Sequence, residues 1–242
     1  MVQTGLDANK ISIRRWDSPR LIYFSPLGLR VKAAVAQERT DEEQARVAVA
    51  SELRRGMHLL VGREPSADGM KVLRTSLRRL FDQLDAVPER VRGTRVWQGP
   101  PADGEMFADS IDRPVSGSGN PFSVPMVVQR QGDTAVSIVT LDAGFEGAPG
   151  RSHGGFVSAI FDDLFGSLPM LQSKVAFTAS LTVNYVAPSP VFEPVVFRGW
   201  IDRVEGRKIF VAGEAHHGET LVTTATGLFI DSTEMMASFY GA

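Results

Sequence analysis

The chain has 242 residues, of which 43% are apolar and 22% are charged, as in ordinary globular proteins. Its net charge of −2 excludes a strongly basic surface, so nucleic acid is not an expected partner. It has no cysteine, which excludes disulfides, thiolate metal sites and a cysteine nucleophile and favours a cytoplasmic location. No apolar run approaches the roughly 20 residues that a membrane-spanning helix needs.

Two amphipathic helices are predicted in the first third of the chain. Thr40 followed by Glu43 is a capping-box pattern, and apolar residues then recur at helical spacing until Gly62 ends the first helix. A second helix is predicted over about Met70–Leu84, with its leucines on one stripe. Three arginines lie off this stripe and are interpreted as a solvated face: Arg74, Arg78 and Arg79. The two helices form a hairpin that must pack against another surface.

A change of composition marks the predicted domain boundary. Residues 87–125 are rich in Gly, Pro, Ser and Asp, as loops and linkers are. The sequence therefore predicts an N-terminal extension over residues 1–115, with the helical hairpin and a Gly/Pro-rich linker. A second domain is predicted over residues 116–242, and the role of the extension is left open.

After residue 125 the hydrophobic period changes to two, which predicts strands. A hairpin with Gly132-Asp133 at its turn comes first, and a later segment alternates from Val175 to Tyr185. The segments predicted as strands are 127–130, 134–141, 175–185, 195–204, 208–215 and 221–230. One long apolar helix lies between the second and the third. A helix wrapped by an antiparallel sheet is an α+β architecture.

The central helix opens with a pair of glycines and carries a carboxylate that a core element does not need. Its apolar residues cover most of its circumference, which predicts a buried helix. On a helical wheel one strip holds small residues and a single acid: Gly155, Ser158, Ala159, Asp162 and Gly166. Another backbone or a ligand is expected to approach this strip. Burial of an ionised Asp162 is costly, so a raised pKa or a chemical role is expected, whereas Asp163 is interpreted as structural.

Several motifs in this half of the chain follow one another in a recognisable order. They are His153-Gly154-Gly155, Asp162 nine residues after the histidine, Phe177-Thr178-Ala179, Val183-Asn184-Tyr185 and Val204-Glu205-Gly206-Arg207-Lys208. Over about residues 121–231 the sequence resembles the hotdog-fold acyl-CoA thioesterases, in particular the phenylacetate-pathway and human thioesterase-superfamily group. The resemblance implies a hotdog fold, in which an antiparallel sheet wraps around one long helix. Many relatives carry Asn or Gln about six residues before the histidine, where this chain has Gly147.

The resemblance also implies catalytic roles for named residues. The backbone N–H of Gly154, helped by that of Gly155, would hold the oxyanion at the positive end of the helix. His153 would position the thioester carbonyl. Asp162 would act as general base for water or as nucleophile, and both alternatives stay open. Thr178 would hold the water, although its place in the strand alternation also suits a side chain that faces solvent.

Substrate binding is expected at Gly155 and Ser158 on the strip, and at Arg207 and Lys208 beside a tight turn. The two turn charges either meet the phosphates of coenzyme A or are solvated. Asp162 lies about 10 Å along the helix from Gly155, too far for one carbonyl to touch both. The carboxylate would therefore come from a second, antiparallel helix, which the family supplies from another protomer. A homodimer or a dimer of dimers is expected.

The predicted function is hydrolysis of acyl-CoA thioesters, with a medium- or long-chain fatty acyl group, to free acid and coenzyme A. Neither a metal nor a cofactor is expected, since the adjacent His216 and His217 would point to opposite faces of a strand. Five phenylalanines are interpreted either as an acyl tunnel or as core: Phe122, Phe145, Phe156, Phe161 and Phe165.

Two other functions stay open on the sequence. The first is a non-catalytic acyl-CoA sensor or interaction module that works through residues 1–115. The second is a hotdog hydratase or dehydratase that acts on enoyl or hydroxyacyl thioesters. The acyl chain length, and the choice between coenzyme A and a carrier protein, are left open as well.

Overall fold

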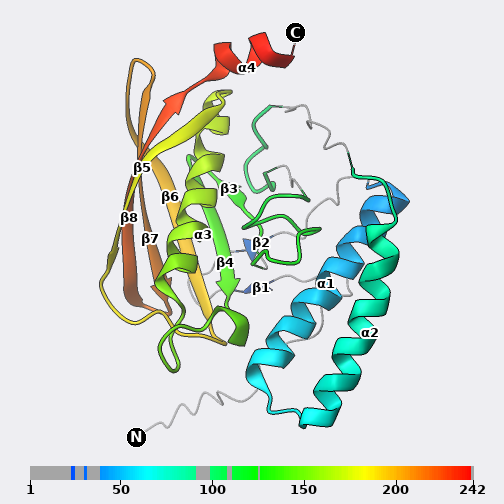
Figure 1. Ribbon diagram of the computed structural model, residues 1–242. Helices are drawn as coiled ribbons and strands as arrows, with labels where there is room; N and C mark the ends of the chain where they lie inside the picture. Colours follow the sequence, from blue (N-terminus) through cyan, green and yellow to red (C-terminus); the bar gives the residue numbers. More distant parts are fainter. Residues whose placement is uncertain are drawn as a thin grey trace, which may run out of the picture.

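The computed structural model describes residues 23–24, 30–31, 39–90, 99–107, 111–124 and 126–240 (Figure 1). Two short strands, β1 (Tyr23–Phe24) and β2 (Arg30–Val31), pair with each other. The C-terminal half forms a sheet with one long helix against it, and two N-terminal helices lie beside this body (Figure 1). Among the described residues, no helix is both long enough and apolar enough to cross a membrane.

Six strands of the described part form one antiparallel sheet in the order β3-β4-β6-β7-β8-β5. Their bounds are β3 Gln129–Gln131, β4 Thr134–Thr140, β5 Ala176–Tyr185, β6 Pro194–Glu205, β7 Lys208–His217 and β8 Thr220–Asp231. The predicted α+β fold with an antiparallel sheet is confirmed. β5 precedes β6 in the chain but lies at the far edge of the sheet, where it pairs with β8.

The central helix α3 (Gly154–Ser167) lies against this sheet and continues into a short 3₁₀ turn, η2 (Leu168–Gln172) (Figure 1). Its apolar side is fully buried, including Ile160, Phe161, Leu164 and Phe165, each 0% exposed. Gly199 and Gly213 stand opposite each other on β6 and β7. A Cβ atom on either would lie 3.0 or 2.7 Å from the Phe165 ring, so both positions must be glycine for the helix to seat.

The expectation that α3 is buried all round is wrong for the single chain. The sheet covers the apolar side of the helix, and the strip of small residues lies beside the edge strand β5, where it is only partly covered. Gly155 and Asp162 are exposed, and Ser158, Ala159 and Gly166 are half-buried. Asp162 is therefore not a buried carboxylate in one protomer, because hydrophobic periodicity cannot tell which sides of a helix the rest of the chain covers.

The two N-terminal helices form where they were predicted, as α1 (Asp41–Gly62) and α2 (Ala67–Asp85). The capping box of α1 is present, with Thr40 Oγ1 accepting from the Glu43 N–H and a Glu43 carboxylate oxygen accepting from the Thr40 N–H. Ser66 caps α2 with a single bond, in which its Oγ accepts from the Gly69 N–H. All of α2 is exposed or half-buried, so α2 packs far less tightly than α3.

Residues before position 116 contribute to the packing of the sheet domain. The side chain of Phe107 is in the main hydrophobic core, and its N–H donates to the Val128 carbonyl. α1 lies against a 3₁₀ turn, η1 (Ala143–Phe145), just before α3. The boundary between residues 115 and 116 stays a prediction. The chain ends, as far as it is described, with α4 (Thr233–Tyr240).

Candidate active site

The N-terminus of α3 has one open backbone donor. His153 is the N-cap residue, and its Nδ1 accepts a 3.0 Å hydrogen bond from the Gly155 N–H. The N–H groups of Phe156 and Val157 donate to the His153 carbonyl. Within the described part of the chain the Gly154 N–H has no acceptor. It points outward at the positive end of the helix dipole, where it can bind a developing negative charge.

The same geometry assigns a proton to the His153 ring. Because Nδ1 accepts from the Gly155 N–H, the neutral ring carries its hydrogen on Nε2. Nε2–H is then a second donor on the residue that caps α3. The Gly155 N–H, which the sequence suggested as a helper for the oxyanion, is already used by the cap.

Tyr185 holds the start of α3, and sequence reasoning missed it. Its hydroxyl donates to the Gly154 carbonyl at 2.7 Å and lies 2.8 Å from Ser158 Oγ. The phenol has one hydrogen, so the Ser158 hydroxyl is the donor in the second bond. A Cβ atom on Gly154 would lie 3.0 Å from the Tyr185 ring. Tyr185 was quoted within Val183-Asn184-Tyr185, but nothing local in that motif indicated its contact with a residue 31 positions earlier.

Asp162 and Thr178 form the second part of the site. Thr178 Oγ1 donates a 2.8 Å hydrogen bond to Asp162 Oδ1, so Thr178 reaches α3 although its side chain is also exposed. The reason is a β-bulge: Thr178 pairs with Phe229 and Ser180 with Leu228, which leaves Ala179 as an extra residue. The face that points toward the core therefore changes along β5.

The bulge corrects the predicted alternation of this strand. Before it, Ala176 packs on the core and Thr178 reaches Asp162; after it, Leu181 and Val183 pack on the core. Phe177, predicted on the inner face, is 49% exposed. An extra residue shifts a pattern of period two by one step, and only pairing with β8 reveals where that step lies.

One chain does not bring the two parts together. Gly154 and Asp162 are eight residues apart on α3, which is about 12 Å along a helix. On β5, Tyr185 lies beside Gly154 and Thr178 lies beside Asp162. The described chain therefore carries a donor end, with His153 and Gly154, and a separate carboxylate end.

The two turn cations lie at the carboxylate end of the sheet. In the register of the sheet, Lys208 stands opposite Ile230, and Ile230 stands opposite Phe177, next to Thr178. Arg207 Nε donates to the Asp231 carbonyl at 3.0 Å. Both side chains are exposed, so they can meet an anionic ligand there.

One residue in the loop before His153 departs from the pattern of the relatives. A Cβ atom at Gly147 would lie 3.0 Å from the His153 Cα, so a larger residue there would require the loop around His153 to shift. Of the five phenylalanines, Phe145, Phe161 and Phe165 are 0% exposed and belong to the core. The Phe156 ring lies 5.7 Å from that of Phe122, which is 57% exposed.

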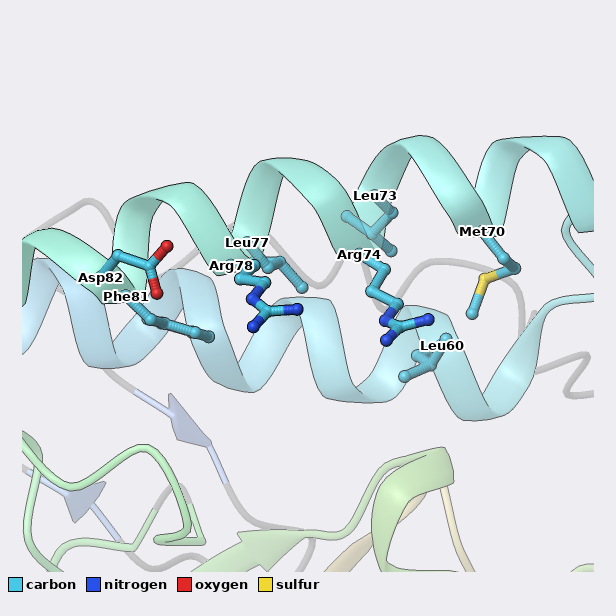
Figure 2. Close-up of a pocket in the computed structure, with 8 residues that line it drawn as sticks. All are labelled: Leu60, Met70, Leu73, Arg74, Leu77, Arg78, Phe81 and Asp82. Atoms are coloured by element: carbon cyan, nitrogen blue, oxygen red, sulfur yellow. The ribbon is translucent and has the colours of Figure 1, made fainter.

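A histidine–glutamate contact and one surface groove lie apart from the candidate active site. His217 Nε2 lies 2.6 Å from Glu193, and no group of three or more potential metal-binding side chains occurs in the described ranges. An open groove of about 380 Å³ lies along α2, with one residue of α1 beside it (Figure 2). It is lined by Leu60, Met70, Leu73, Arg74, Leu77, Arg78, Phe81 and Asp82 (Figure 2).

Known proteins are similar to the part of the chain that carries the residues of this site. Residues 150–224, which include both ends of the site, match the family described as Thioesterase superfamily. The mouse acyl-coenzyme A thioesterase THEM4 is 33% identical over 111 residues, which are 45% of this chain and 48% of the mouse protein. The human acyl-coenzyme A thioesterase THEM5 is 31% identical over 87 residues, 35% of each protein. The chain thus spans half or less of the length of these curated relatives.

A solved structure of a thioesterase superfamily protein is similar over a longer stretch. It has 27% sequence identity and a TM-score of 0.64, and the match covers 76% of this chain and 94% of that chain. A match of that length extends beyond residues 116–242, so part of the N-terminal extension has a counterpart in that structure. The fold and the family match agree: residues 150–224, which match the Thioesterase superfamily, lie within a domain that has the hotdog fold.

Proposed function

We propose that the protein hydrolyses acyl-CoA thioesters to a free acid and coenzyme A. The observation that carries the proposal is the unbonded Gly154 N–H at the positive end of α3, together with an exposed Asp162 held by Thr178. A thioester hydrolase needs both parts: a donor for the oxyanion and a base or nucleophile for the carbonyl carbon. The names of the mouse and human relatives support the same activity.

In the proposed reaction the thioester carbonyl oxygen accepts from the Gly154 N–H and from His153 Nε2–H. Thr178 uses its hydrogen on Asp162 Oδ1, which leaves its oxygen free to accept from water. A water that donates to Asp162 and to Thr178 presents a lone pair to the carbonyl carbon. Asp162 takes a proton from the water, the tetrahedral intermediate collapses, and the C–S bond breaks as that proton passes to the leaving sulfur, which releases the coenzyme A thiol. Direct attack by Asp162 is the alternative.

The site is completed by a second copy of the chain in this proposal. β5 is an edge strand with mostly exposed residues, and the small-residue strip of α3 is only partly covered beside it. Pairing of two β5 edges about a two-fold axis would place the two α3 helices antiparallel. The carboxylate end of one protomer would then meet the donor end of the other. Both a dimer and a dimer of dimers can use this pairing.

The substrate class is the least constrained part of the proposal. Arg207 and Lys208 are offered as contacts for the phosphates of coenzyme A, next to the carboxylate end. Phe122 and Phe156 are offered as contacts for a medium- or long-chain fatty acyl group, because they are the phenylalanines of the cluster that reach the surface. A cysteine-free chain fits a role in cytoplasmic fatty acid metabolism.

Thiol release from purified protein, across acyl-CoAs of increasing chain length, tests the proposal. We expect turnover that Asp162→Asn lowers by about 10²-fold or more, since it removes the proposed base or nucleophile. Asp133→Asn, in the exposed β3–β4 turn, is the matched control and should keep wild-type activity. Acyl-CoA binding without thiol release at any length would reject hydrolysis and favour a sensor. Loss of the conjugated enoyl thioester absorbance instead would favour a hydratase.

A further inference from the structure

α1 of the N-terminal extension contacts the loop that leads into the candidate active site. His58 Nδ1 accepts a 3.0 Å hydrogen bond from the Gly144 N–H, across 86 residues of sequence. A Cβ atom on Gly144 would lie 2.8 Å from Met57 Cε and 2.9 Å from His58 Nδ1. The backbone of η1 therefore lies directly on α1, and a side chain at position 144 would push against Met57 and His58.

Phe145, the residue after Gly144, links this contact to His153. The carbonyl of Phe145 accepts a 2.9 Å hydrogen bond from the His153 N–H. The Phe145 ring packs edge-on against His58 at 5.2 Å and against Phe156, in the first turn of α3, at 4.6 Å. The N-cap of α3 is thus held through a loop that α1 holds in turn.

Arg54, one helical turn before His58, secures the loop on the other side of Phe156. Its guanidinium donates to the carbonyls of Asn120 and Ser118 and to Ser123 Oγ, at 2.6–3.1 Å. This loop carries Phe122, whose ring contacts Phe156. One face of α1 therefore anchors both loops that border the donor end of the site.

We infer that His58 is a positioning residue for the candidate active site, which it acts on through Gly144, Phe145 and the N–H of His153. The inference rests on the proposed function and deepens it, because it gives the N-terminal extension a part in the same site. His58 touches no reacting atom. It keeps the η1 loop where His153 caps α3 and where the Gly154 N–H stays open.

The bond depends on a neutral imidazole. Burial lowers the pKa of His58; nearby Asp142 acts in the opposite direction, and Arg54 lowers the pKa further. A protonated ring would turn an N–H toward the Gly144 N–H and lose the acceptor. Acid should therefore release the η1 loop before it unfolds the chain.

Two variants of the full chain separate positioning from bulk packing. His58→Leu fills the space but removes the acceptor, while His58→Asn keeps an acceptor near Nδ1 and does not titrate. Arg55→Ala is the control on the same helix, since Arg55 is exposed and pairs only with Glu52 among the described residues. Thiol release is measured from about pH 5 to about pH 8, and amide hydrogen exchange at Gly144 and His153 is measured by NMR.

We expect His58→Leu to lower kcat about tenfold or more with little change in KM, and to speed amide exchange at both positions. His58→Asn should keep kcat within about twofold at neutral pH and lose less activity than the wild type in acid. A folded His58→Leu variant with wild-type kcat and exchange would overturn the inference. If His58→Leu does not fold, the inference would be overturned by a His58→Asn variant that loses as much thiol-release activity at acid pH as the wild type.

The two failures are distinguishable. Absence of turnover in the wild type would reject the proposed function, and the amide exchange of His153 would still report whether His58 holds the loop. Wild-type turnover with unchanged exchange in His58→Leu would reject the positioning role alone.

Discussion

The Tyr185 hydroxyl donates a 2.7 Å hydrogen bond to the Gly154 carbonyl, so the last residue of β5 is tied to the first residue of α3. The same hydroxyl accepts from Ser158, one turn further along the helix. An edge strand thereby fixes the helix end at which the Gly154 N–H is open.

Removal of that hydroxyl should loosen the start of α3. Tyr185→Phe is expected to cost about 1 kcal/mol, or about 2–4 °C in Tm for a chain of this size. Ser158→Ala should lose part of the same network, so the two changes together should cost less than their sum. Thermal unfolding of the two single variants and the double variant measures this coupling. Strict additivity would contradict the shared hydroxyl bond.

A matched pair at Gly154 tests the oxyanion donor. Gly154→Ala and Gly154→Pro both add a Cβ atom at the same place, 3.0 Å from the Tyr185 ring. Only proline removes the N–H, and proline is well tolerated at the first position of a helix. Thiol release should therefore be about 10²–10³-fold slower in Gly154→Pro than in Gly154→Ala. Equal rates in the two variants would show that this N–H binds no oxyanion.

The hydroxyl of Thr178 should matter more than its shape. Thr178→Val keeps the branched side chain in β5 but loses the bond to Asp162, and we expect kcat to fall about tenfold. Thr178→Ser keeps a hydroxyl at the same place and is the control, expected within about threefold of the wild type. Steady-state kinetics measure kcat for both variants. A fully active Thr178→Val variant would show that Thr178 has no role in the proposed reaction.

Mixed oligomers test whether one site uses two protomers. Gly154→Pro lacks the donor and Asp162→Asn lacks the carboxylate, so each alone should be inactive. In a mixed dimer one site is intact and the other carries both changes, so purified mixed dimers should keep about half of wild-type activity. Thiol release after co-expression and purification through two tags measures it. No recovery of activity in verified mixed dimers would mean that both groups act within one chain.

Asp231 should make stability depend on acid pH. The N–H and hydroxyl of Thr233, and then Lys174, hold the pKa of Asp231 below its ordinary value. Unfolded aspartate titrates near about 3.9, so this stabilisation is present above that pH and is lost as pH falls through the lower folded-state pKa.

Asp231→Asn should therefore lower Tm at neutral pH by about 2–4 °C, the effect of roughly 1 kcal/mol. The difference from the wild type should shrink as pH falls below the ordinary aspartate pKa of about 3.9 and through the lower folded-state pKa. Asp133→Asn, exposed in a turn, serves as the control at each pH. A constant difference across the range would mean that the charge of Asp231 does not contribute.

Elements that depend on nearby residues were predicted well. The capping box from Thr40 to Glu43 and the start of α3 at Gly154 follow from bonds that span a few residues, so the local sequence is enough to locate them. The antiparallel sheet and its hairpins follow from the change of period and from turn residues such as Gly132. The family resemblance rested on motifs in the same half of the chain.

The arrangement around the site depends on contacts that no local pattern records. The step in β5 at Ala179 is set by pairing with β8, and it turns Thr178 toward Asp162. The bond from His58 to Gly144 joins residues 86 positions apart. Exposure of the Asp162 side of α3 depends on which surfaces the rest of the chain covers.

The sequence by itself thus determined the fold class, the places of the helices and most strands, and the group of residues that carry the candidate chemistry. Only the tertiary structure decided that Tyr185 and Thr178 hold the two ends of α3, that the Gly155 N–H is used by His153, and that α1 supports the site. The physical reason is that periodicity and caps arise from neighbouring residues, whereas strand register, bulges and side-chain partners arise when distant segments pack together.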